Sequence, residues 1–287
     1  MSTWRLTKGT DMAGFTAAST ITPRDEASDC ADYESEFDVV LDAQWSVDTK
    51  LHGGYLLAIL GRAAAHAAGS GYRHLTAISG SFLVPPEPGP ALVRVEVLRA
   101  GRSSAQLRAR LIQHGVPSVE ALITQGRITQ ADSWWSLLDP VELPDEQDCF
   151  LVPCDAPAAG FSVPLMDVVE QRLDPGVLGF AVGAPSGRGV IAGWQRLADG
   201  TDWDPLSLLI ALDPVPPVSY DLGVPGWTPS VSLTAYIRAL PAPGPVRVRM
   251  QATEITDDRM DEVAHVWDAR GRLVAQSTQI AAIRVPA

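Results

Sequence analysis

The chain has 287 residues, of which 46% are hydrophobic and 20% charged, and its formal net charge is −12. This length and composition predict a globular protein with room for two domains of ordinary size, each with its own hydrophobic core. The acidic balance and the absence of a lysine- or arginine-rich patch disfavour nucleic acids and anionic lipids as partners.

The sequence offers no feature of an exported or membrane-bound protein. No segment approaches the about 18 uninterrupted apolar residues that a membrane helix needs, and the N-terminus lacks the basic start and apolar run of a signal peptide. The three cysteines, Cys30, Cys149 and Cys154, form no CxxC pair and are too few for a disulfide framework. We therefore expect a cytoplasmic protein with reduced thiols and no membrane association.

The first predicted elements are two strands, at 15–22 and 35–45, because both segments are rich in β-branched and aromatic residues. A helix follows, opened by His52-Gly53-Gly54 and ended by Gly69 to Gly71, with leucine and alanine at helical spacing. Its surface is apolar over most of its circumference, which is typical of a buried helix. Four strand-like runs come next, at 75–84, 91–101, 104–115 and 118–128.

The order of elements then starts again. Residues 131–159 are rich in Pro, Asp and Glu and lack a sustained period, which indicates a connecting segment. A shorter helix is predicted within 202–213, where Asp204 is a candidate N-cap and Pro205 falls in the first turn. Strands are predicted on both sides of that helix, at 167–173, 189–197, 231–240, 245–255, 261–271 and 272–285.

The two halves also repeat in sequence. Pro88-Gly89-Pro90 precedes Pro243-Gly244-Pro245 by 155 residues, and Gly115 precedes Gly271 by 156. We interpret this as a duplicated module, packed face to face, with any pocket between the copies. One buried helix held in an antiparallel sheet is the hot-dog arrangement. The prediction is therefore an α+β double hot-dog, with two antiparallel sheets, each wrapped around a central helix, joined into one extended sheet. The expected divisions are 1–130, a connecting segment at 131–160, and 161–287.

Several stretches resemble the TesB-like acyl-CoA thioesterases, particularly their actinobacterial thioesterase-like branch. They include HGGYLLAIL at 52–60 and DPLSLLIALDPVPP at 204–217. The others are SGSFLVPPEPGPALVRVEVLRAGRSSAQLRARLIQ at 79–113 and GRLVAQSTQIAAIR at 271–284. The resemblance implies hydrolysis of an acyl-CoA to a free acid and coenzyme A, without a cofactor.

The resemblance also implies a set of site residues. In that family an Asp, a Ser or Thr, and a Gln on strands of the second module hold a water molecule. By position, the Gln matches Gln279, the Thr falls at or near Thr253, and the Asp falls at Ser232. Ser79 occupies the comparable strand of the first module. Serine cannot act as a carboxylate base, so Ser232 is a departure from the family pattern.

Residue types in the sequence fit the thioester hydrolysis that the resemblance implies. Hydrolysis needs a donor for the carbonyl oxygen, and the free N–H groups of a helix that starts at His52, Gly53 and Gly54 could supply it. A simple turn into the helix, with His52 as its cap, is the alternative. Asp204 is the best carboxylate to accept a proton, although an N-cap role is the commoner use of such a residue.

Other sites are weaker. Arg99 and Arg102 could meet the phosphates of coenzyme A, or simply be solvated. The five histidines lack metal-binding spacing, and no G-x-G-x-x-G follows a strand, so neither a metal nor a dinucleotide is expected. Besides a thioesterase, the sequence leaves open a non-hydrolytic acyl-thioester binding protein of a biosynthetic pathway. A hydratase or dehydratase would need a partner for His52. Free sheet edges leave a homo-oligomer open.

Overall fold

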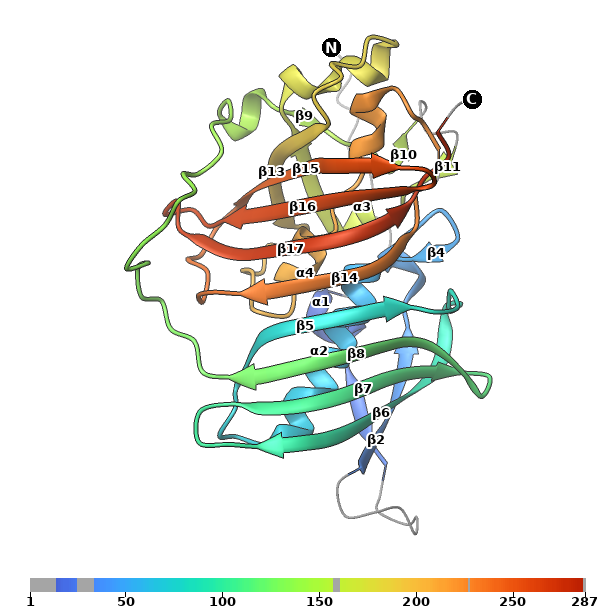
Figure 1. Cartoon of the computed structure of the whole chain (residues 1–287), viewed down its shortest axis with the longest axis vertical. Coiled ribbons are helices and arrows are strands. Elements are labelled where there is room, and N and C mark those ends of the chain that lie inside the picture. The colour runs from blue at the N-terminus through green and yellow to red at the C-terminus, as the bar shows by residue number, and fades with distance from the viewer. Residues whose placement is uncertain (1–13, 25–33, 157–160, 227, 286–287) are drawn as a thin grey trace, which may run out of the picture.

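A computed structural model describes residues 14–24, 34–156, 161–226 and 228–285. Cys30 and the N-terminal leader lie outside these residues. Figure 1 shows the two modules as the lower, blue-to-green half and the upper, yellow-to-red half of one curved antiparallel sheet. In the described part of the chain this sheet has thirteen strands, in the order β1-β2-β6-β7-β8-β5-β14-β17-β16-β15-β13-β12-β9.

The strands of the first module form one side of the sheet. From the edge inward they are β1 (Ile21–Pro23), β2 (Glu34–Leu41), β6 (Gly89–Ala100), β7 (Ala105–Gln113), β8 (Val116–Gly126) and β5 (His74–Phe82). The second module continues with β14 (Ser230–Ile237), β17 (Leu273–Ala282), β16 (Arg259–Trp267), β15 (Val246–Thr256), β13 (Val190–Leu197), β12 (Val169–Leu173) and β9 (Phe150–Leu151). The order on one side of the β5–β14 contact mirrors the order on the other, and this confirms the double hot-dog.

The modules meet edge to edge, not face to face. Strand β5 pairs with β14 over the register from Ala77↔Tyr236 to Ser81↔Ser232. Ser79 and Thr234, which are 155 residues apart, stand opposite each other, and their hydroxyl oxygens lie 2.8 Å apart. The expectation of face-to-face packing is wrong because the two edge strands complete each other's backbone hydrogen bonds, which removes two free edges.

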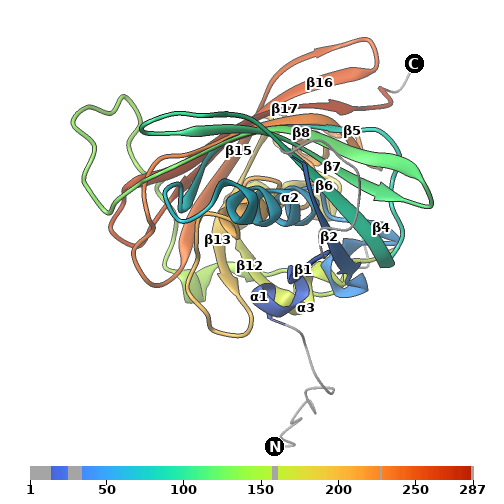
Figure 2. The ribbon, with the colours of Figure 1, turned by 90° about the horizontal axis from the view of Figure 1, so that it is seen from below.

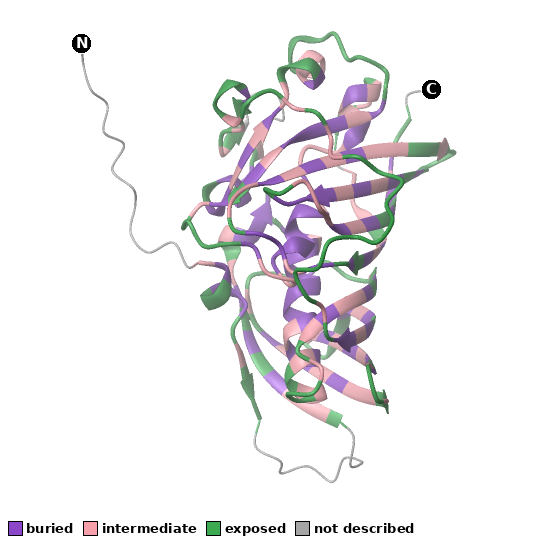
Figure 3. Cartoon of the chain, turned by 90° about the vertical axis from the view of Figure 1, so that its left-hand side faces the viewer, coloured by how far each residue is buried: buried purple, intermediate pink, exposed green. Residues whose placement is uncertain are grey.

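The central helix α2 (Gly53–Ala68) lies in the hollow of the curved sheet (Figure 2). Its apolar surface is covered by β5 to β8 on one side and by the second module's helix α4 (Leu208–Ala211) on another. Buried residues gather on α2 and alternate mainly with partly buried ones along the strands (Figure 3). Burying each large side chain such as Leu57 or Leu60 contributes about 1.5–3 kcal/mol to folding.

The close approach of the two helices explains Gly54. A Cβ atom at this position would lie 2.2 Å from the backbone oxygen of Leu209. Any larger side chain would therefore push α2 away from α4. Gly69, with φ of +79°, ends α2 in a conformation that glycine adopts without strain.

The small elements differ from the prediction in places. Residues 15–18 form the short helix α1 (Phe15–Ala18), not a strand, because Phe15 and Ala18 face the core one helical turn apart. The second helix is shorter than its predicted segment. The remaining elements are α3 (Leu165–Val168), β3 (Ser46–Val47), β4 (Lys50–Leu51), β10 (Asp155–Ala156), β11 (Phe161–Ser162), and the 3₁₀ helices η1 (Ala43–Trp45), η2 (Glu146–Asp148), η3 (Pro175–Val182) and η4 (Val218–Leu222).

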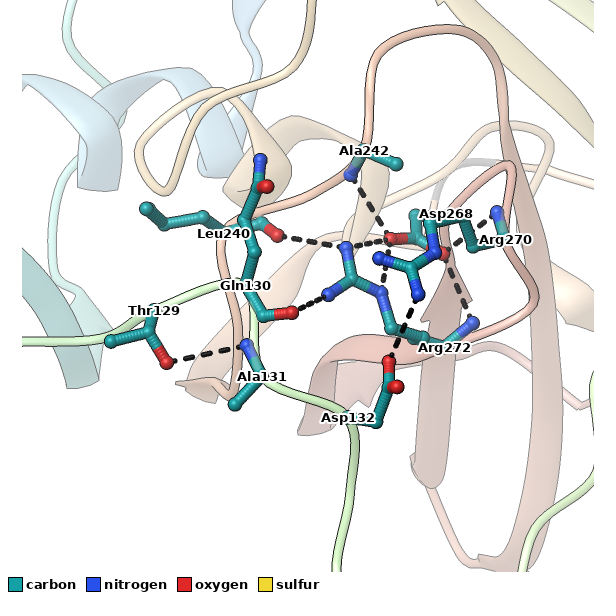
Figure 4. Close-up of polar contacts among 9 residues, drawn as sticks. All are labelled: Thr129, Gln130, Ala131, Asp132, Leu240, Ala242, Asp268, Arg270 and Arg272. Carbon is teal, nitrogen blue, oxygen red and sulfur yellow. Dashed lines mark hydrogen bonds and ion pairs between the residues drawn. The ribbon is translucent and has the colours of Figure 1, made fainter.

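The start of the connecting segment is fastened to the second module by a buried ion pair (Figure 4). Arg272 donates to the Asp268 carboxylate at 2.6 Å, to the Leu240 carbonyl at 3.2 Å, and to the Gln130 carbonyl. Asp268 is fully buried and also accepts from the Ala242 N–H at 3.0 Å. The pair thus joins the β16–β17 turn to the chain that leaves the first module.

Candidate active site

A cavity of about 340 Å³ lies between the two modules. Its walls come from the start of α2, the ends of β5 and β8, the segment after α4, and strands β14 to β17. Most of the lining is apolar and includes Leu51, Leu56, Phe82, Val119, Val215 and Met250. The polar exceptions gather in two places, at the N-terminus of α2 and on the facing strands of the second module.

His52 caps α2 and has both ring nitrogens engaged. Its Nδ1 accepts from the Tyr55 N–H at 3.4 Å, and its Nε2–H donates to the Asp213 carbonyl oxygen at 2.6 Å. The ring is buried, with 4% of the residue exposed. His52 therefore ties the first helix to the second module and keeps no free nitrogen to take a proton from a substrate.

The Asp213 carboxylate lies at the N-terminus of α2, although Asp213 itself follows α4 in the other module. Its Oδ2 accepts from the Gly54 N–H at 3.1 Å and lies 3.5 Å from His52 Nε2. Both contacts, together with the positive end of the helix dipole, hold a negative charge there. Oδ1 has no hydrogen-bond partner among the described residues and is free to accept from a water.

Gly53 completes this end of the helix. Its N–H has no acceptor within the described part of the chain. The next two N–H groups differ, because that of Gly54 donates to Asp213 and that of Tyr55 donates to His52. A Cβ atom at Gly53 would lie 2.8 Å from Asp213 Oδ2 and 2.9 Å from the Phe82 ring. A larger residue here would displace this carboxylate or the ring, whereas glycine leaves both in place and lets a ligand approach the N–H group.

Three side chains on strands of the second module form a hydrogen-bonded series in the lining of the same cavity. The Ser230 hydroxyl donates to Gln279 Oε1 at 3.2 Å, and Gln279 Nε2 donates to Glu262 Oε2. Gln279 and Glu262 stand opposite each other on β17 and β16, so their side chains share one face of the sheet. All three line the cavity.

The environment of Glu262 is unusual for a carboxyl group. Burial raises the pKa of Glu262 to about 7, and the charge of Asp213 acts in the same direction. The Gln279 amide and the Val218 backbone N–H oppose this shift because they favour the ionised form. The two carboxylates of the cavity therefore influence each other electrostatically.

The structure brings some of the predicted site residues together. Gln279, His52 and Gly53 line the one cavity, and Gly54 stands directly behind them with its N–H on Asp213. Ser232 does not line the cavity. A β-bulge between Ser230 and Ser232 shifts the alternation of β14, so that Ser230 faces inward. A position-by-position transfer of the family pattern cannot anticipate this shift.

The other predicted residues lie away from the cavity. Ser79 is exposed on the outer face of β5, and Thr253 is exposed beside a bulge in β15, where its hydroxyl donates to the Asp261 carbonyl. Asp204 caps the turn before α4 by accepting from the N–H groups of Leu206 and Ser207 at 2.8 and 2.7 Å.

Arg99 and Arg102 are exposed near the turn between β6 and β7. Strand register places Arg99 opposite Gln106, and Gln106 opposite Thr124, which lies beside Ala77 of β5. The cavity instead touches the other end of β5, at Phe82. The first module contributes Lys50, exposed at the cavity, as the nearest cation of the lining.

Sequence reasoning missed Asp213, Ser230 and Glu262. Glu262 had a readable signal, because Met260, Glu262, Ala264 and Val266 alternate along β16 and all four are buried. A charged residue at a buried position of an alternating strand indicates function more often than packing. Asp213 gave no comparable signal, since its role depends on a helix 160 residues earlier in the chain.

The arrangement can perform water-dependent acyl chemistry. It combines an unpaired helix N–H, a carboxylate with a free oxygen, and a serine–glutamine pair around one apolar space. Among the described residues, no group of three or more His, Cys, Asp or Glu side chains is placed to hold a metal ion. Within the same residues, no helix is both long enough and apolar enough to cross a membrane.

Comparisons with known proteins identify two family domains in the chain. The acyl-CoA thioesterase N-terminal domain matches residues 41–126, and the acyl-CoA thioesterase C-terminal domain matches residues 141–283. An uncharacterized protein of Mycobacterium tuberculosis strain H37Rv is 31% identical over 290 residues, which cover 94% of this chain and 98% of the relative.

Solved structures share the whole fold. A protein from Thermobifida fusca that was assigned as a thioesterase II has a TM-score of 0.82 at 28% identity, over 94% of this chain and 97% of that one. The tesB protein of Mycobacterium avium subspecies paratuberculosis has a TM-score of 0.70 at 14% identity, over 94% and 98%, which shows a common fold. The chain belongs to the TesB-like family of double hot-dog acyl-CoA thioesterases.

Proposed function

We propose that the protein hydrolyses acyl-CoA thioesters to free acids and coenzyme A, with Asp213 as the proton acceptor. One observation carries this proposal: the Asp213 carboxylate sits on the N-terminus of α2, across the same cavity from Ser230 and Gln279. The helix start and the polar strands come from different modules, so the site exists only where the two modules meet.

The reaction follows from these positions. The thioester carbonyl oxygen is placed at the free Gly53 N–H, where developing negative charge meets the positive end of α2. A water between Asp213 Oδ1 and the Ser230–Gln279 pair attacks the carbonyl carbon and gives its proton to Asp213. The carbon–sulfur bond then breaks, the electron pair leaves with sulfur, and the proton passes to the coenzyme A thiolate.

The walls of the cavity fit an acyl chain. Leu56, Val119 and Met250 are apolar and buried, so an alkyl chain placed against them replaces water on both surfaces. Lys50 is exposed at the same cavity and is the cation that we expect to meet a phosphate of coenzyme A.

Two alternatives lose their support at this site. A non-hydrolytic binding protein is suggested by the missing carboxylate at Ser232, but Asp213 provides a carboxylate from another segment. A dehydratase needs a histidine base, and His52 stands near Asp213, yet both of its ring nitrogens are already engaged. Neither alternative is favoured by another contact in the cavity.

The test is release of thiol from acyl-CoAs of graded chain length, followed with a thiol reagent. We expect turnover by the wild type and a decrease in kcat of about 10²- to 10⁴-fold in Asp213→Asn, which keeps the side-chain shape but removes the proton acceptor. The matched control is Asp261→Asn on the exposed side of β16, with kcat unchanged. Absence of turnover with every chain length, or full activity in Asp213→Asn, contradicts the proposal.

A further inference from the structure

Glu262 is a buried carboxyl group that the proposed reaction does not use. Only 2% of the residue is exposed, and its Oε1 has no hydrogen-bond partner among the described residues. Burying an ionisable group in an apolar wall costs stability unless it is paired, and the one side chain that bonds to Glu262 is Gln279. The placement suggests that Glu262 acts on Gln279.

The Gln279 amide has two possible orientations, and they differ in what they offer to the cavity. In the observed one, Nε2 faces Glu262 and Oε1 accepts the Ser230 hydroxyl proton. The opposite orientation would place the amide oxygen against an ionised carboxylate, and two acceptors repel each other. It would also turn the amide nitrogen toward Ser230.

The orientation of the Gln279 amide decides whether Ser230 accepts a hydrogen bond from a water. When the Ser230 hydroxyl donates to Gln279 Oε1, the lone pairs of the serine oxygen remain available to accept from the water. The second N–H of Gln279 stays free to donate. If the amide were reversed, its N–H would occupy one of the two serine lone pairs, and the hydroxyl proton, which then lacks Gln279 as its acceptor, would point to the water. Ser230 would then act as a donor to the water and not as its acceptor.

We infer that Glu262 is a positioning residue for the proposed hydrolysis: its ionised carboxylate holds the Gln279 amide in the orientation that lets Ser230 accept from the attacking water. The inference rests on the proposed function and adds to it a residue that acts through Gln279. It also makes turnover depend on the ionisation of Glu262.

The other ionisable groups around Glu262 do not account for this dependence of turnover on its ionisation. Asp213, Tyr220, Lys50 and His52 line the same cavity, and of these only Asp213 shifts the pKa of Glu262. The neighbouring strand β15 presents the apolar side chains of Met250 and Ala252, and η4 presents the Val218 N–H. Because the charge of Asp213 contributes to the raised pKa of Glu262, a variant at Glu262 itself is needed to assign the pH dependence.

The experiment is the pH profile of kcat and KM for wild type and Glu262→Gln between about pH 5.5 and about pH 9. We expect the wild-type kcat to rise with an apparent pKa near 7, as Glu262 ionises. In Glu262→Gln this limb should disappear, and kcat at the alkaline end should fall about tenfold, because two neutral amides permit both orientations. KM should stay within about twofold, since no contact with the acyl chain is lost.

Two further variants keep the result decisive. Glu254→Gln, exposed on β15, makes the same chemical change away from the cavity and should retain the wild-type profile. Glu262→Asp keeps an ionisable group, so it should retain a pH-dependent limb even with a lower kcat, and it serves if Glu262→Gln does not fold. A Glu262→Gln profile equal to that of the wild type overturns the inference. If the wild type hydrolyses no acyl-CoA, the proposed function fails instead.

Discussion

The inner faces of the two modules have the same backbone register, but one cross-strand pair is apolar in the first module and polar in the second. In the first module Leu107 of β7 stands opposite Ile123 of β8, and both side chains are buried. The same cross-strand pair in the second module, 155 and 156 residues later, is Glu262 opposite Gln279. The two modules therefore share the sheet at this position but differ in having an apolar pair in one and a polar pair in the other.

Other site residues follow the same rule. Ser230 corresponds to Leu75, 155 residues earlier, and a β-bulge follows each of them at the same place. In the helices the offset is 208 − 56 = 152, because LLIAL at 208–212 resembles LLAIL at 56–60, and Asp213 therefore corresponds to Gly61 within α2. Leu75 and Gly61 are both buried. The first module therefore contributes a helix start and a scaffold, while the second contributes all of the acidic and amide groups.

The helices differ for a reason that is visible in the sequence. Helix α2 has 16 residues, whereas α4 has four and is followed by Asp213-Pro214-Val215-Pro216-Pro217. Proline lacks the N–H that a continuing helix needs and restricts the residue before it, so α4 ends there. The segment that replaces the missing turns forms part of the cavity wall. The shorter second helix thus leaves room for a cavity wall that the longer first helix would not.

The largest expected effect concerns the free energy of unfolding. It tests whether the buried Glu262–Gln279 pair destabilises the second module. Glu262→Leu restores the residue type of its counterpart, Leu107. The folded pKa of Glu262 is about 7 and its ordinary value 4.5, so the folded wild type binds a proton that the unfolded chain releases as the pH rises. Its stability is full below about pH 4.5 and declines until about pH 7.

Glu262→Leu lacks this titration. Its free energy of unfolding relative to the wild type should therefore increase by about 3 kcal/mol between about pH 4.5 and about pH 8. Urea unfolding at both pH values measures the difference, with Glu254→Leu as the exposed control. A gap that is independent of pH would mean that Glu262 is not buried as a titrating group.

The next effect concerns activity. Gln279→Ala should lower kcat by about 10²-fold, because it removes both the group that orients Ser230 and an amide donor. The first-module comparison is Ile123→Ala, which lies at the equivalent position and should cost stability, by about 2–5 kcal/mol, with kcat of the folded fraction retained. Thiol-release kinetics and urea unfolding of both variants make the comparison. Unchanged turnover in Gln279→Ala would remove this residue from the site.

The smallest effect separates two neighbouring serines. Ser230→Ala should lower kcat about tenfold, because the water loses one acceptor, whereas Ser232→Ala, beyond the bulge, should leave kcat unchanged. The same thiol-release assay reads both variants. If Ser232→Ala lowered kcat and Ser230→Ala did not, Ser232 would be the site residue, as the family resemblance implies. That result would contradict the inward direction of Ser230.

The repeat, the order of strands and the long helix could be predicted because each depends on local periodicity or on similarity between the two halves. Gln279 could be placed because its strand resembles the family over a continuous stretch. Ser230 could not, since a bulge of one residue reverses which side chains face inward. Asp213 could not either, because its hydrogen bond to Gly54 joins segments that only the tertiary fold brings together.

The shared ladder between β5 and β14 has a consequence for turnover. A hinge between the modules cannot open the site, because swinging them apart would break the backbone hydrogen bonds that run from Ala77↔Tyr236 to Ser81↔Ser232. Entry of the acyl chain and escape of the acid must instead depend on the rim segments, at 84–86 and 214–217. These rim segments are therefore where we expect gating of the proposed reaction, and Asp213, the proposed proton acceptor, directly precedes one of them.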